Sequence, residues 1–148
     1  MLTHLDREPI NVQRAQTQHE QYEHCLSKLG YQLHQLPAEP DLPDSVFVED
    51  TAIVFDELAI VSRPGNPARR PETTSVAAAL SAYRDLTSIQ PPGTLDGGDV
   101  LVVGRQVYAG LSSRTNREGL DQLTALLTPF GYRVVAVPVW AVFISSQR

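Results

Sequence analysis

The 148-residue chain is long enough for one domain with a sizeable core, and its 42% hydrophobic content is ordinary for a globular protein. No apolar run approaches the ~20 residues that cross a bilayer, and the first ten residues lack a signal-peptide pattern, so we expect a cytoplasmic protein without a membrane partner. The net charge of −5 argues against a nucleic-acid partner and favours a small cationic ligand.

The predicted elements follow a repeat with a period of about fifty residues, marked by apolar residues at helical or alternating spacing between turns. Residues 45–55, SVFVEDTAIVF, read as a buried strand that carries Glu49 and Asp50, and Thr115 with Glu118 reads as a capping box. In chain order, the sequence predicts a helix over 11–30, a strand over 31–37, a hairpin over 48–63, a helix over 73–83, a strand over 85–90, a hairpin over 99–114, a helix over 115–127 and a strand over 132–139.

This order is a repeated ββαβ unit. Each unit must bury its apolar faces against its neighbours, so the repeat predicts a radial α/β assembly that forms one partial domain over 1–148. The sequence begins midway through one unit and stops after the strand that should lead into a third hairpin, and residues 140–148 read as an atypical tail. An open array leaves strand edges unprotected, so we expect self-association into a homo-oligomer through those edges.

Carboxylates concentrate at equivalent places in the two repeats. Asp44, Glu49 and Asp50 enter the first hairpin, and Asp96 and Asp99 enter the second. If the units surround an axis, both clusters face one pocket, which would suit an arginine-like ligand because carboxylates pair bidentately with a planar guanidinium. The alternative is structural: Asp44 and Asp99 are turn or cap residues, and Glu49 pairs with a neighbouring arginine.

Two loops that follow the hairpins carry arginines, which could hold the carboxylate of an amino-acid ligand. The alternative for any single arginine is a solvated position in a loop after a strand. These residues are Arg63, Arg69, Arg70, Arg114 and Arg117.

Four motifs carry a family resemblance by their order and spacing: LPDSVFVEDTA, SRPGNPARRPE, TLDGGDVLVVG and GLSSRTN. Over residues 10–139 the chain resembles the dimethylarginine dimethylaminohydrolase (dimethylargininase) family of the guanidine-modifying superfamily. The resemblance implies the pentein fold, a five-bladed α/β propeller, of which this chain would hold about two and a half of five units. It also implies a small guanidine substrate, methylarginine or arginine, with no cofactor and no metal.

The resemblance places the substrate-binding residues on the acidic and basic clusters described above. It implies that Asp50 binds the substrate guanidinium and that Glu49 and Asp44 belong to the same loop. It further implies that Arg69 and Arg114 hold the α-carboxylate of the substrate.

The resemblance implies that Asp96 orients a catalytic histidine. The family's histidine lies in a strand resembling LHLKS just after the VPV stretch, where this chain reads WAVFISSQR instead, and the family's nucleophilic cysteine lies near its C-terminus. Cys25 reads as a small buried residue of the first helix. Four histidines read as surface or locally bonded residues: His4, His19, His24 and His34.

In the family's chemistry a cysteine thiolate attacks the guanidinium carbon, methylamine or dimethylamine leaves, and water hydrolyses the thiouronium intermediate to citrulline. Without the nucleophile and the histidine, we expect that this chain alone does not turn over methylarginine. Three interpretations stay open: a truncated or frame-shifted hydrolase, a self-associating half-propeller that binds arginine-like cations, and a fragment completed by a separate chain.

Overall fold

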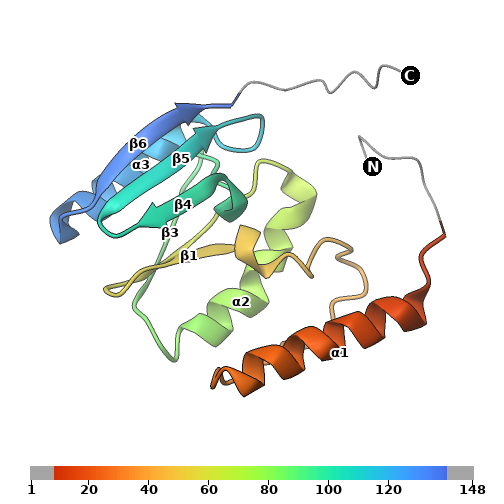
Figure 1. Ribbon diagram of the computed structural model, residues 1–148. Coiled ribbons are helices and arrows are strands. Elements are labelled where there is room, and N and C mark those ends of the chain that lie inside the picture. Colours follow the sequence, from red (N-terminus) through yellow and green to blue (C-terminus); the bar gives the residue numbers. More distant parts are fainter. Residues whose placement is uncertain (1–8, 140–148) are drawn as a thin grey trace, which may run out of the picture. The chain divides into compact units, whose positions relative to one another are not determined.

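The computed structural model describes residues 9–139 (Figure 1), so His4 and the predicted tail over 140–148 lie outside the described residues. The described residues form two units, which divide between residues 35 and 36. The first unit contains helix α1 (Val12–Lys28). Asn11 caps this helix, because its side chain accepts a hydrogen bond from the backbone N–H of Arg14. The helical spacing of the sequence therefore predicted this element correctly, but the prediction that Cys25 is buried is wrong, because Cys25 is exposed.

The strand predicted over 31–37 is wrong. These residues pair with no other strand among the described residues, and Tyr31 and Leu33 are exposed. A strand depends on hydrogen bonds to a neighbouring strand, so apolar alternation without such a neighbour does not form one.

The second unit contains two modules of the same topology. In the first module, strands β1 (Ala52–Val54) and β2 (Ala59–Val61) form an antiparallel hairpin. Helix α2 (Thr73–Leu80) then crosses over to β3 (Leu86–Ser88), which pairs in parallel with β2. Short 3₁₀ helices precede β1 and α2, over Val48–Asp50 and Pro67–Glu72.

The run over 45–55 is not the single buried strand that its apolar residues predict. Val48, Glu49 and Asp50 form the 3₁₀ helix, and β1 begins only at Ala52. The carbonyl groups of Phe47 and Val48 accept hydrogen bonds from backbone N–H groups three residues ahead, so they are not available for a ladder. Asp50 therefore lies just before a strand rather than inside one.

In the second module, β4 (Val100–Val103) and β5 (Gln106–Leu111) form an antiparallel hairpin. Helix α3 (Arg117–Leu127) crosses over to β6 (Arg133–Pro138), which pairs in parallel with the whole of β5 (Figure 1). The α/β class and the ββαβ order are as the repeat predicted, whereas the partial propeller and the number of its units stay predictions. Short 3₁₀ helices precede β4 and follow α3, over Gly97–Asp99 and Thr128–Phe130.

The predicted capping box of α3 is wrong, because the cap residue is Asn116 rather than Thr115. The Asn116 side-chain oxygen accepts hydrogen bonds from the backbone N–H groups of Gly119 and Thr94. The hydroxyl group of Thr115 instead donates to Asp99. Asn116 therefore fastens the start of α3 to the loop that precedes the second module.

One apolar cluster joins the two modules, and the hairpin turns add polar contacts to it. The Tyr132 ring meets the Phe55 ring edge-on, with 4.9 Å between ring centroids, and the Tyr132 hydroxyl donates to Glu57. Arg105 lies over the Tyr132 ring and also pairs with Glu57. The buried apolar residues are Ile53, Phe55, Leu58, Ile60, Ile89, Leu95, Val107, Ala109, Leu120, Leu123, Leu127 and Tyr132.

Candidate functional site

The segments that lead into the two hairpins meet at a pair of glycines. A Cβ atom on Gly97 would overlap the carbonyl oxygen of Glu49, and a Cβ atom on Gly98 would overlap the carboxylate of Asp50. Only residues without a side chain allow this approach. The GG of the LDGGD motif therefore brings Asp50 of the first module against the start of the second.

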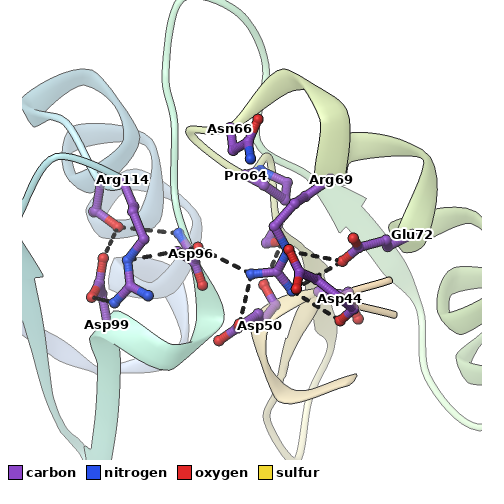
Figure 2. A network of polar contacts seen from close by, with 12 residues as sticks. Asp44, Asp50, Pro64, Asn66, Arg69, Glu72, Asp96, Asp99 and Arg114 are labelled. Atoms are coloured by element: carbon purple, nitrogen blue, oxygen red, sulfur yellow. Dashed lines mark hydrogen bonds and ion pairs between the residues drawn. The ribbon is translucent and has the colours of Figure 1, made fainter. Parts of the chain in front are cut away.

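Arg69 lies in a cluster of carboxylates (Figure 2). Its Nη1 donates to Asp50 Oδ2 at 2.8 Å, and its Nε and Nη2 lie 3.0 and 2.9 Å from Glu72 Oε2. Asp44 Oδ2 is 3.8 Å from Nε. The Arg69 side chain is only 11% exposed. Burial disfavours its charged form, but the hydrogen bonds to Asp50 and Glu72 outweigh this and raise the pKa of Arg69.

Arg114 forms the other half of the cluster, together with Asp99. Its Nη2 lies 2.5 Å from Asp99 Oδ1, while Asp99 Oδ2 accepts hydrogen bonds from the hydroxyl groups of Ser112 and Thr115, each at 2.7 Å. The Asp99 side chain is 8% exposed and that of Arg114 is 50% exposed. Arg114 can therefore meet a ligand from solvent while Asp99 fixes it from behind.

Asp96 lies between the two arginines (Figure 2). Its Oδ2 is 4.0 Å from Arg69 Nη1 and 3.9 Å from Arg114 Nε, and its side chain is 2% exposed. Its Oδ1 is buried without a hydrogen-bond partner among the described residues. Burial, together with the neighbouring Asp50 carboxylate, raises the pKa of Asp96 to about 6.

The remaining predicted residues lie at the margin of this cluster or outside it. Glu49 is exposed and pairs with no arginine among the described residues, so the structural alternative of a Glu49–Arg pair is wrong. Arg63 and Arg70 donate to the backbone carbonyl groups of Gly93 and Pro64 and do not join the carboxylates. Asp44 approaches Arg69 through its side chain, and its backbone carbonyl accepts from Arg69 Nη2 at 3.3 Å.

Glu72 is the main site residue that the sequence interpretation missed. It is buried, with its side chain 2% exposed, and it binds Arg69 through two donors. A signal exists in the sequence, because Glu72 follows Arg69 by three residues in ARRPE, the spacing at which neighbouring helical side chains meet. Without the burial of both side chains, that spacing resembles any surface ion pair.

The cluster has an excess of negative charge. Five carboxylates surround two guanidinium groups, so three negative charges are uncompensated when every carboxyl is ionised. An excess of negative charge attracts a cation. The carboxylates are Asp44, Asp50, Glu72, Asp96 and Asp99. The described residues contain no group of three potential metal ligands arranged for a metal ion.

Comparison with known proteins places the chain in a family. Residues 3–142 match the family model described as "N,N dimethylarginine dimethylhydrolase, eukaryotic". Over 140 residues the chain is 42% identical to the N(G),N(G)-dimethylarginine dimethylaminohydrolase of Streptomyces coelicolor, a match that covers 94% of this chain and 54% of that protein. The chain belongs to the dimethylarginine dimethylaminohydrolase family.

A second relative in the dimethylarginine dimethylaminohydrolase family is the Pseudomonas aeruginosa protein, which is 37% identical over 80% of this chain and 47% of its own length. A cysteine-to-serine mutant of dimethylarginine dimethylaminohydrolase from the same species, solved in complex with citrulline, superposes with a TM-score of 0.89 at 34% identity, over 95% of this chain and 56% of that chain. The chain thus spans about half the length of these relatives.

The fold extends beyond the dimethylarginine dimethylaminohydrolase family. An amidinotransferase from Microseira wollei superposes with a TM-score of 0.71 at 16% identity, over 89% of this chain and 50% of that chain, which is a likeness of fold alone.

Within residues 9–139, no helix is both long enough and apolar enough to span a membrane.

Proposed function

We propose that the second unit is the substrate-binding part of an amidine hydrolase that acts on the guanidinium C–N bond of methylated arginine. The observation that carries this proposal is the convergence of Asp50, Asp96, Arg69 and Arg114 from both modules into one cluster. Asp50 binds the ligand guanidinium, and Arg69 and Arg114 bind its α-carboxylate. Glu49 and Asp44 border the same position.

Asp96 is proposed to orient a histidine. Its Oδ1 is buried and has no donor among the described residues, and a buried carboxylate oxygen in this state requires a partner. An imidazole N–H is a suitable donor for it. The name of the relatives and the citrulline bound to the Pseudomonas aeruginosa mutant agree with arginine-like chemistry at such a site.

This polypeptide on its own is proposed to bind arginine-like cations without hydrolysing them. The sequence has no histidine after His34, and its single cysteine, Cys25, lies in α1 of the first unit. Binding and electrostatics alone leave the chemical step without a nucleophile or a proton acceptor.

The binding part of the proposal is tested by calorimetric titration of the purified chain with asymmetric dimethylarginine and with arginine. We expect the chain to bind both ligands saturably. The Asp50→Asn variant should bind both about tenfold or more weakly, because one charge-assisted hydrogen bond to the guanidinium is removed. Asp56→Asn is the matched control, since Asp56 is exposed in the turn of the first hairpin. Equal affinity of the two variants would exclude Asp50 as the guanidinium ligand. Citrulline should not rise above a no-enzyme control.

Self-association is the second candidate function, and an exposed apolar face favours it. On the sheet of the second module, Leu101 is paired with Tyr108, and both are exposed, as is Val103. Edge strand β4 carries no charged residue that would discourage pairing with another chain. Light scattering during size-exclusion chromatography should therefore give a mass of at least two chains, and a monomer across a hundredfold range of concentration would rule this function out.

A further inference from the structure

Two residues that are proposed to bind opposite ends of the ligand bind each other. Asp50 is proposed to bind the ligand guanidinium, and Arg69 its carboxylate, yet Arg69 Nη1 donates to Asp50 Oδ2 at 2.8 Å. The only carboxylate oxygens that reach Nη1 come from Asp50 and, at 4.0 Å, from the buried Asp96, among the described residues. A guanidinium group therefore already binds one oxygen of the carboxylate at which the ligand guanidinium is proposed to bind.

The two ends of the Arg69 guanidinium are held differently. Nε and Nη2 both bind Glu72, whose side chain is 2% exposed and follows on the same 3₁₀ helix. Nη2 also donates to the backbone carbonyl of Asp44 at 3.3 Å, whereas Nη1 makes its only hydrogen bond, among the described residues, to Asp50. Arg69 can release Asp50 by breaking one hydrogen bond, while Glu72 and the Asp44 carbonyl keep its guanidinium in place.

Arg114 does not compete in this way. It is paired with Asp99 and lies near Asp96, and it makes no hydrogen bond or ion pair with Asp50. The two arginines, which the family resemblance treats as equivalent, therefore differ in their effect on a ligand. Arg114 is available to a carboxylate from the start, whereas Arg69 becomes available only when Asp50 is taken over.

We propose that Arg69 is a specificity-determining residue, because it competes with the ligand guanidinium for Asp50. A ligand displaces Arg69 from Asp50 at low cost only if the ligand also carries a carboxylate. An arginine-like zwitterion supplies a guanidinium to Asp50 and an anion to the released Nη1, so each broken charge-assisted bond is replaced. A simple guanidinium cation takes Asp50 but leaves Nη1 unpaired beside Asp96. This inference rests on the proposed function and adds selection against guanidines that lack a carboxylate.

Agmatine, which is arginine without its carboxylate, is the probe that separates a competitor from a passive carboxylate-binding residue. If Arg69 only binds the carboxylate, Arg69→Gln weakens arginine and leaves agmatine unchanged. If Arg69 also competes for Asp50, the same variant binds agmatine about tenfold more tightly than the wild type, because one charge-assisted hydrogen bond no longer has to be broken.

The experiment is a calorimetric titration of arginine and of agmatine into the wild-type chain, Arg69→Gln and Arg70→Gln. Arg70→Gln is the matched control, because this substitution removes the same charge at the next position. Arg70 itself donates to the backbone carbonyl of Pro64 and not to Asp50. We expect the wild type to prefer arginine by about tenfold, and this preference to disappear in Arg69→Gln but persist in Arg70→Gln. The double variant Arg69→Gln/Glu72→Gln leaves no buried unpaired carboxylate at position 72 and should show the same gain for agmatine.

The outcomes distinguish the inference from the proposed function. If the wild type binds arginine but neither variant lacking Arg69 gains affinity for agmatine, Arg69 is not a competitor and the proposed function stands. A gain of similar size in Arg70→Gln would assign the effect to net charge and also overturn the inference. If no variant binds either ligand, the proposed function fails and the inference fails with it.

Discussion

Replacing Asp99 with alanine is expected to lower the free energy of unfolding by about 3 kcal/mol at pH 7. The Asp99 carboxylate accepts from the hydroxyl groups of Ser112 and Thr115 and from the Arg114 guanidinium, and it is almost completely buried. Alanine leaves the buried Thr115 hydroxyl without its acceptor and Arg114 with only the more distant Asp96. Urea unfolding followed by circular dichroism measures the change.

Two further variants make the Asp99 experiment specific. Asp99→Asn keeps one acceptor oxygen for the hydroxyl groups but loses the charge, so its destabilisation should be intermediate. Asp121→Ala removes an exposed carboxylate of α3 and should change the free energy of unfolding by about 0.5 kcal/mol or less. If Asp99→Ala and Asp121→Ala change the free energy of unfolding equally, the hydrogen bonds to Asp99 do not stabilise the second module.

Replacing Asp96 with asparagine is expected to make the protein more stable at pH 7, by up to about 3 kcal/mol. Burial and the adjacent Asp50 raise the pKa of Asp96 to about 6 in the folded state, against an ordinary value of 3.8. Between these two pKa values the folded chain holds more protons than the unfolded chain, so stability falls as pH rises. Asparagine has no charge to bury, and its amide N–H group can donate towards Asp50 in place of the carboxyl proton.

The pH dependence supplies the sign of the Asp96 effect. The advantage of the wild-type carboxyl is fully present below about pH 4 and is lost above about pH 6, so the two proteins should differ little at pH 4 and diverge by pH 6. Urea midpoints of both proteins measured from pH 4 to pH 7.5 give the difference directly. An Asp96→Asn protein that is less stable than the wild type at pH 7 would mean that Arg69 and Arg114 stabilise the ionised carboxylate.

The sequence was sufficient to predict the parts of the fold that depend on local pattern. Both hairpins and the crossover helices lie where alternation, turn residues and helical spacing placed them. The strand over 31–37 failed because strand formation requires a partner, which local alternation does not reveal. The predicted cap of α3 was wrong because Thr115 and Asn116 are both residues that cap helices well, and the Thr115 hydroxyl donates instead to Asp99, which is distant in sequence.

The candidate site was predictable in its membership but not in its pairing. Equivalent positions of the repeat pointed to Asp50 and Asp96, and the structure brings both into one cluster with Arg69. The direct contact between Asp50 and Arg69 could not be foreseen, because it depends on where the 3₁₀ helix over Pro67–Glu72 places the Arg69 side chain. Glu72 was missed for the same reason, since its burial is set by tertiary packing.

The two halves of the cluster adjoin hairpins whose strands differ in length. Strand β5 pairs with β4 on one side and with β6 on the other, and its Val107 and Ala109 side chains are fully buried. Asp99 and Arg114 lie just before and just after this hairpin, whereas Asp50 lies at the entry to a strand of three residues. We therefore expect the Asp50 end to open more often than β5 and the Asp99–Arg114 pair, because shorter strands carry fewer ladder hydrogen bonds.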